Sequence, residues 1–582
     1  MFRHRWARAL RGISMASASI ALVGGALAAP AYAGATPKPG SNPAVDYQDP
    51  IDALPPVSRP DTKSCSVTAV DHDFGYTLGG PPYTTTLTPP EKCKGPWNKV
   101  VLDWSGSVKG RQYDRLAAVF IGGAEVFRTS TAEPDDDGIS WHVAKDITDF
   151  APLLKDPQKL QLELGNVVND TYTGVYRINL KITYYQADKR HPAAGTADRI
   201  VPLGDTDSDS APWMNVGKGG STRTEVTFPR NLTKARLEVY ARGSGCDEQW
   251  FDAVPSDLAE TAPDYLCGGG PYREVQVAVD GQPAGLAQPY PVVYSGGIVP
   301  TLWRPIPAVD QFKTEAYDID LTPFAGLLAD GKPHAISITP YGAADGWNVD
   351  GSLFLDTDAH ASRTSGKVTA NTLSHAPVVK TVQTPRKDGS TDVSVSTGRS
   401  WKISGYVETS KGRVTTTVEQ EFAYTNTDNV SRTGSHQVMH QRDHGSTTVT
   451  TQLHGRTDAQ RNTWSYPIDV DMDIPLYGDY NNYDMRAAVT QRRVLVDTSR
   501  KGSAHAWHTD AVTDDTVDST GSIARTNGVV QSADGASTET YRGTTDTGAC
   551  YSRSLTTAHG WVTRDQQSHC RVADVVRDAL KG

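Results

Sequence analysis

Alternation of apolar and polar residues is the feature that most restricts the fold of this chain. The even-numbered residues from 178 to 184 are Ile, Leu, Ile and Tyr, whereas the odd-numbered ones from 177 to 183 are Arg, Asn, Lys and Thr. Side chains of a β-strand point alternately to its two faces, so this spacing predicts an antiparallel strand with one buried face. Residues 414–424 repeat the pattern, and helical patterns are scarce. With 52 Gly and 36 Pro among 582 residues to form turns, the chain is predicted to be all-β.

Breaks in this pattern divide the chain into segments. Residues 34–62 are rich in Pro and Ala and predict an extended lead-in or pro-segment rather than packed structure. Residues 63–186 and 199–357 each contain several short strand-like runs and predict two β-sandwiches, separated by a polar linker. Residues 368–575 are rich in Thr, Ser and Val and predict a third, β-rich domain.

The first 33 residues are organised like a secretory signal peptide. Four Arg precede an apolar stretch at residues 13–29, and Ala31 and Ala33 occupy the two positions that signal peptidase reads. A retained membrane anchor is the weaker interpretation, because the apolar stretch falls short of the roughly 20 residues that cross a bilayer. We therefore expect a signal peptide at residues 1–33, a secreted protein, and no membrane contact after cleavage.

Six Cys follow this segment, and an even number behind an export signal predicts disulfide bonds. Proximity in the sequence favours the pairs Cys65–Cys93, Cys246–Cys267 and Cys550–Cys570. The second pair would close the base of a long insertion at residues 243–271, and insertions of this length are usually functional. No Cys-x-x-Cys spacing supports a zinc site.

Charge and missing motifs exclude several functions. The formal net charge is −10, whereas a general nucleic-acid binder presents a basic surface. The zincin, P-loop and nucleophile-elbow motifs are absent from the sequence. His436, His440 and His444 are four residues apart, but on a strand that spacing separates them by roughly 13 Å, too far for one ion. We therefore expect no metal, no cofactor and no nucleic-acid partner.

A carboxylate at the start of an apolar strand is the first candidate for chemistry. Residues 109–112 form a turn that delivers Asp114 and Arg115 to the strand at residues 117–121. This position is the rim of a sandwich, where ligand-binding loops gather. Arg115 would keep Asp114 ionised, while burial would raise the pKa of Asp114. Such an Asp can act as a general base in mildly acidic media, or it can form an Asp–Arg pair that only fixes a turn.

Several motifs follow one another in order over about residues 65–357. They are Gly110–Arg115, Gly122-Gly123, Arg128 with Thr131–Pro134, Gly165-Asn166, Thr171–Tyr176, Leu237–Tyr240, Asp247-Glu248-x-Trp250, Gly270–Val275, Ser295–Pro300 and Leu302–Pro305. By these motifs the chain resembles the peptide-N-glycosidase A family, whose members are peptide-N-(N-acetyl-β-glucosaminyl)asparagine amidases.

The resemblance implies hydrolysis of the side-chain amide between Asn and the first N-acetylglucosamine of N-glycosylated peptides or glycoproteins, in acid and without a metal. It also implies that the two sandwiches are of the jelly-roll type, as in the shorter bacterial relative peptide-N-glycosidase F. The main catalytic Asp of that relative matches Asp114. Its two assisting Glu align near Gly165-Asn166 and Gly268–Gly270, so they do not carry over to this chain.

Roles can be assigned on that basis. Asp114 would deprotonate the attacking water, and Arg115 and Arg304 would donate to the developing oxyanion. Glu248, in the disulfide-closed insertion, would protonate the departing nitrogen, with Glu133 in reserve.

Trp250 and Trp303 would present flat faces to the sugar rings, although core packing is the alternative for both.

Two other functions stay open: a non-catalytic carbohydrate-binding β-sandwich protein, and a glycosidase that cuts between sugars. We expect a monomer.

Overall fold

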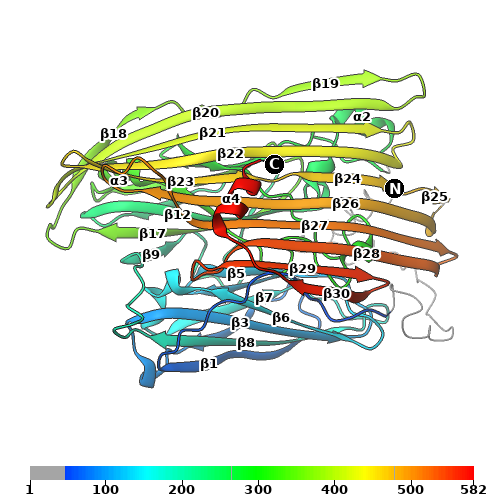
Figure 1. The fold of residues 1–582 in the computed structure, drawn as a ribbon, viewed down its shortest axis with the longest axis horizontal. Coiled ribbons are helices and arrows are strands. Elements are labelled where there is room, and N and C mark those ends of the chain that lie inside the picture. The colour runs from blue at the N-terminus through cyan, green and yellow to red at the C-terminus, as the bar shows by residue number, and fades with distance from the viewer. Residues whose placement is uncertain (1–45, 264, 478, 582) are drawn as a thin grey trace.

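The computed structural model describes residues 46–263, 265–477 and 479–581, and the signal segment at residues 1–33 lies outside them. Strands dominate the described chain, as Figure 1 shows, and helices are few and short. The prediction of an all-β protein with two sandwiches and a further β-rich part is confirmed. The first sandwich, blue and cyan in Figure 1, lies below one long sheet that runs from β19 to β30.

Two four-stranded antiparallel sheets form the first sandwich. The first has the order β1 (Ser64–Phe74), β8 (Val175–Gln186), β3 (Trp97–Lys109), β6 (Ile139–Asp146). The second has the order β2 (Tyr83–Leu87), β7 (Gln158–Leu164), β4 (Leu116–Ile121), β5 (Ala124–Ser130). In β8 the even-numbered side chains from Tyr176 to Tyr184 are buried, as the alternation predicts. By contrast β5 is buried on both faces, because the second sandwich packs against it through β17.

The second sandwich also consists of two antiparallel sheets. One has the order β10 (Met214–Val216), β17 (Trp347–Thr357), β12 (Leu232–Gly243), β15 (Tyr317–Asp320), with β9 (Arg199–Pro202) also paired to β17. The other has the order β11 (Thr224–Thr227), β16 (Pro333–Tyr341), β13 (Glu274–Val279), β14 (Gln282–Ala287). The insertion between β12 and β13 contains two 3₁₀ turns, η4 (Gly245–Asp247) and η5 (Trp250–Asp252), and the helix α2 (Ser256–Thr261).

A single thirteen-stranded antiparallel sheet makes up most of the last third of the chain. Its main order is β18 (Ser365–Asn371), β20 (Thr391–Thr409), β21 (Gly412–Val430), β22 (His436–Leu453), β23 (Arg456–Ser465), β26 (Asp479–Arg500), β27 (His508–Thr526), β28 (Val529–Thr544), β29 (Cys550–Ala558), β30 (Trp561–Gln567). The side strands are β19 (Lys380–Pro385), β24 (Ile468–Asp473) and β25 (Leu476–Tyr477). One face of this sheet shares a continuous hydrophobic core with the second sandwich.

Helices and disulfides complete the framework. The helix α3 (Ala325–Leu328) packs between the second sandwich and β18, and α4 (Val572–Ala579) packs on β26, β27 and β28. All three predicted disulfides are confirmed: Cys65–Cys93, Cys246–Cys267 and Cys550–Cys570. Within the described ranges, no helix has the length and apolar character needed to span a bilayer.

The lead-in differs from its prediction as an extended segment outside the packed structure. Its described part, residues 46–62, contains no helix or strand, yet Tyr47 and Ala53 are buried. Backbone hydrogen bonds tie it to distant parts of the chain, because the Ile51 N–H donates to the Pro305 carbonyl (3.2 Å) and the Ala53 N–H to Glu539 (2.8 Å). The segment therefore joins the second sandwich to the long sheet.

Candidate active site

Asp114 lies where the sequence places it, in the short segment that leads from β3 into β4. Hydrogen bonds fix the backbone on both sides of it. The Tyr176 hydroxyl donates to the Tyr113 carbonyl (2.7 Å), and Arg115 exchanges hydrogen bonds with Thr131 through its N–H (2.8 Å) and its carbonyl (2.9 Å). The Asp114 side chain is thus held at the rim of the first sandwich, half-buried.

Three carboxylates converge at this rim from three separate loops. Asp114 comes from the turn before β4, Glu133 from the loop after β5, and Glu248 from the insertion after η4. Burial raises the pKa of Asp114 well above its ordinary value, and the charges of Glu133 and Glu248 raise it further. Among the described residues, the Asp114 carboxylate has no hydrogen-bond or ion-pair partner. The structure therefore brings together three of the predicted site residues.

Arg115 does not hold Asp114 in its ionised form as expected. Its guanidinium is directed at two amides, with Nε 3.2 Å from Oδ1 of Asn166 and Nη2 on Oε1 of Gln112. The charge of Arg115 lowers the pKa of Asp114, but burial and the two glutamates outweigh it. The Asp–Arg sequence pair is thus not an ion pair, because Asn166 and Gln112 bind the Arg115 guanidinium.

Glu133 forms the first of two ion pairs at the site. Its Oε2 lies 2.5 Å from Nη2 of Arg304, and the ring of Tyr47 lies 4.7 Å from the same guanidinium. The Tyr47 hydroxyl also donates to the Glu133 carbonyl (2.6 Å). Gly296 leaves room for the carboxylate, because a Cβ there would lie 2.6 Å from Oε1 of Glu133. The lead-in and the loop at residues 294–304 therefore both hold Glu133.

Glu248 forms the second ion pair, with a residue that the sequence did not single out. Nη2 of Arg242, at the end of β12, lies 3.3 Å from Oε2 of Glu248. The Arg242 guanidinium also lies 4.4 Å from the centre of the Tyr294 ring. The local signal for Arg242 is weak, because its carboxylate partner is six residues away and its aromatic partner belongs to a different loop.

A buried ion pair anchors the segment that carries Glu248. Asp247 and Arg273 are 0% exposed and lie 2.6 Å apart, Oδ1 to Nη2. The other oxygen of Asp247 accepts from the Ala344 N–H (2.9 Å) and from Nε1 of Trp347 (2.6 Å). Together with the Cys246–Cys267 disulfide, these bonds fix the base of the insertion. Both partners of the ion pair lie within the motifs noted in the sequence.

Trp250 and Trp303 do not present faces to the carboxylates. Each is 4% exposed and belongs to the shared hydrophobic core. Trp250 packs edge-on against Phe251, and Nε1 of Trp303 donates to the Gly297 carbonyl (2.9 Å). The packing alternative therefore describes both rings in this structure, because a stacked sugar needs an open ring face.

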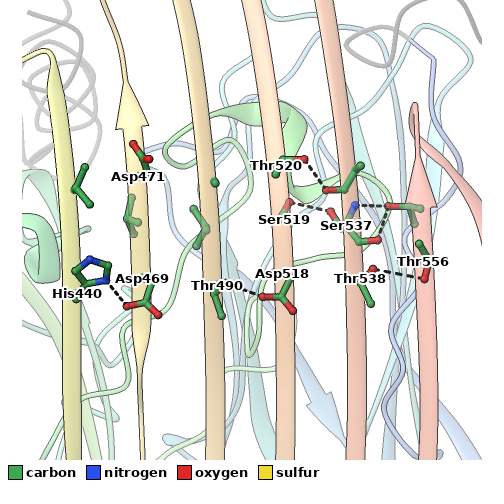
Figure 2. Close-up of a pocket in the computed structure, with 16 residues that line it drawn as sticks. His440, Asp469, Asp471, Thr490, Asp518, Ser519, Thr520, Ser537, Thr538 and Thr556 are labelled. Carbon is green, nitrogen blue, oxygen red and sulfur yellow. Dashed lines mark hydrogen bonds and ion pairs between the residues drawn. The ribbon is translucent and has the colours of Figure 1, made fainter.

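A groove of about 350 Å³ lies on the face of the long sheet that is turned away from the loop at residues 294–304 (Figure 2). Ser519 and Ser537 on β27 and β28 point to the opposite face, where both hydroxyls donate to the Leu302 carbonyl (2.5 and 3.0 Å). The sheet thus separates the groove from the loop that carries Arg304. The labelled side chains that cross it are cross-strand neighbours: His440, Asp469, Thr490, Asp518, Thr538 and Thr556.

PNGase F and PNGF-II are among the solved structures that show some similarity to this chain. PNGase F, a glycosylasparaginase from Flavobacterium meningosepticum, has 14% identity and a TM-score of 0.33, over 51% of this chain and 96% of that one. PNGF-II has 14% identity and a TM-score of 0.34, over 55% of this chain and 64% of that one. TM-scores this low carry no weight for fold or function.

Sequence relationships are much closer. The family model of peptide N-acetyl-beta-D-glucosaminyl asparaginase amidase A matches residues 54–374, and the model of the PNGase_A C-terminal domain matches residues 392–468. Peptide-N4-(N-acetyl-beta-glucosaminyl)asparagine amidase A of Prunus dulcis is 36% identical over 403 residues, which cover 66% of this chain and 70% of that protein. The first model spans more than half of the chain, so the chain belongs to the peptide N-acetyl-beta-D-glucosaminyl asparaginase amidase A family.

Proposed function

We propose that the protein hydrolyses the amide bond between Asn and N-acetylglucosamine in N-glycosylated peptides or glycoproteins. The glycan leaves as a glycosylamine, and the Asn becomes Asp. Family membership supports the reaction, and the convergence of Asp114, Glu133 and Glu248 at one rim is the observation that carries the choice of site. Hydrolysis of an amide needs both a base for water and an acid for the departing nitrogen, which a cluster of carboxylates can supply.

Asp114 is proposed as the base because its carboxylate has no protein partner in the described ranges. It takes a proton from water, whose oxygen attacks the amide carbon of the substrate Asn. The tetrahedral intermediate carries an oxyanion, and we assign its stabilisation to the charges of Arg304 and Arg115. When the carbon–nitrogen bond breaks, the nitrogen receives a proton from Glu248, which enters the step protonated and regains a proton from Asp114 afterwards, with Glu133 as the alternative donor.

The raised pKa of Asp114 sets the acidic end of the active range. A base must be ionised to act, so activity falls as the pH drops through the pKa of Asp114, and this point lies above the ordinary range of an Asp. The proposed enzyme is secreted, which agrees with its three disulfides, and acts as a monomer.

Mass spectrometry of a denatured N-glycopeptide, incubated with the protein in water enriched in heavy oxygen, tests the proposal. We expect the peptide to return as Asp with one heavy oxygen. Asp114→Asn should abolish the conversion, whereas the exposed Asp137→Asn in the neighbouring loop should keep it.

Other outcomes point to other functions. A peptide that retains Asn with one sugar would identify a glycosidase, and glycopeptide binding without conversion would identify a carbohydrate-binding protein. Conversion that survives Asp114→Asn would keep the reaction and overturn the role of Asp114.

A further inference from the structure

Arg242 occupies a central place among the charges of the site. It lies at the end of β12, and its guanidinium pairs with Glu248 at 3.3 Å and packs on the ring of Tyr294 at 4.4 Å. The side chain is 11% exposed, and its Nε is buried without a hydrogen-bond partner among the described residues. A buried arginine with two tightly defined neighbours has little freedom to move.

The balance of charge at the rim depends on this residue. Three carboxylates meet there, and Arg304 is already paired with Glu133. Arg242 is shared between the other two, because it contacts Glu248 and its charge also lowers the pKa of Asp114, more strongly than that of the adjacent Arg115. The charged and titratable groups that face Asp114 are Glu133, Glu248, Arg242, Arg115 and Tyr176.

The loop at residues 294–304 contacts both ion pairs. The Tyr294 ring packs against the Arg242 guanidinium, Gly296 makes room for Glu133, and Arg304 binds the same glutamate. The two glutamates are therefore held at fixed positions by a common support, which is the arrangement needed to keep reacting groups in register with a substrate.

We propose that Arg242 is a positioning residue: its guanidinium fixes the Glu248 carboxylate beside Asp114 and supplies the positive charge that lets Asp114 act as the base. This inference rests on the proposed function. Arg242 contacts no substrate in this role and acts only through the two carboxylates.

The test compares Arg242→Gln and Arg242→Lys with Arg236→Gln. Arg236 is a matched control, because it lies six residues earlier on the same face of β12, pairs with Asp318 (2.6 Å) and packs on the Phe354 ring (4.2 Å). In glycopeptide hydrolysis, Arg242→Gln should move the acidic limb of the kcat/KM profile to higher pH and lower kcat/KM about tenfold or more at pH 5. Arg242→Lys should restore the limb in part, and Arg236→Gln should leave it in place.

Infrared titration of Asp114 gives a second readout that needs no turnover. The carboxyl band of Asp114, identified as the band lost in Asp114→Asn, should disappear at higher pH in Arg242→Gln than in the unchanged protein. An unmoved band and an unmoved acidic limb in a folded Arg242→Gln protein would overturn the inference. If the protein hydrolyses no glycopeptide but the band moves, the proposed function fails while the electrostatic role of Arg242 stands.

Discussion

Glu133 keeps its position because residue 296 has no side chain. Gly296 has φ +77°, in the left-handed region, and a Cβ there would lie 2.6 Å from Oε1 of Glu133. We expect Gly296→Ala to cost about 1–2 kcal/mol from backbone strain and to lower kcat as well, because the carboxylate must move relative to Arg304. Urea unfolding and glycopeptide kinetics measure the two effects.

Gly281→Ala is the control that separates backbone strain from the displacement of Glu133. It has φ +78° in a hairpin turn, and a Cβ there meets nothing within 4 Å. Gly281→Ala should therefore lose a similar amount of stability without a change in kcat. Equal kinetic losses in the two variants would show that Glu133 tolerates the displacement.

Sequence could locate individual residues better than it could orient them. The turn before β4 and the motif around Glu248 identify two of the carboxylates that meet at the rim. The direction of Arg115 could not be predicted, because Asn166 and Gln112 compete for its guanidinium. Nor could the sequence distinguish a buried Trp from an exposed one, since both Trp250 and Trp303 lie in polar or turn-rich segments. The catalytic and binding roles assigned to these residues remain predictions.

At the scale of the element, the insertion depends on one buried ion pair. Asp247→Asn removes the negative charge that compensates Arg273, and both side chains are 0% exposed. Breaking one side of a buried pair typically costs about 3–5 kcal/mol, because the other charge stays buried. We expect a loss of that size in urea unfolding, with lower activity because Glu248 is the next residue.

A matched change in the same insertion provides the control. Asp257 is exposed in α2 and accepts a hydrogen bond from Gln383 (2.9 Å). Asp257→Asn should change stability by less than about 0.5 kcal/mol. A comparably small effect of Asp247→Asn would show that the disulfide alone fixes the insertion.

Strands with one buried face were predictable, and strands with two were not. The alternation in β8 reports a sheet that faces water on one side. In β5 every residue is buried, so the period of two disappears from the sequence. The full length of the strands in the long sheet was also hidden, because their Thr- and Ser-rich sequences contain few apolar residues that would mark where each strand begins and ends.

At the scale of the whole molecule, four acids meet where the lead-in, the second sandwich and the long sheet join. They are Asp52, Asp310, Asp515 and Glu539. Asp515 and Glu539 are nearly fully buried, Glu539 accepts from the Ala53 N–H (2.8 Å), and Asp310 lies 3.1 Å from Arg493. Burial raises the pKa of Asp310 to about 6, and raises those of Asp52, Asp515 and Glu539 as well. Lys313, Lys145, Arg493 and Arg553 oppose this rise, and Glu315 and Asp514 add to it.

These raised pKa values make the folded protein more stable in acid. A carboxyl whose pKa is higher in the folded than in the unfolded protein contributes stability below its unfolded value, near 4, and loses it as the pH rises through its folded value. We therefore expect the thermal midpoint to fall as the pH rises from about 4 through 6 and beyond. Asp515→Asn should flatten this dependence, because it removes a buried charge that forms only at higher pH, whereas the more exposed Asp510→Asn should not. A midpoint that rises over the same range, or an unchanged slope in Asp515→Asn, would show that other groups govern how the three parts of the chain hold together.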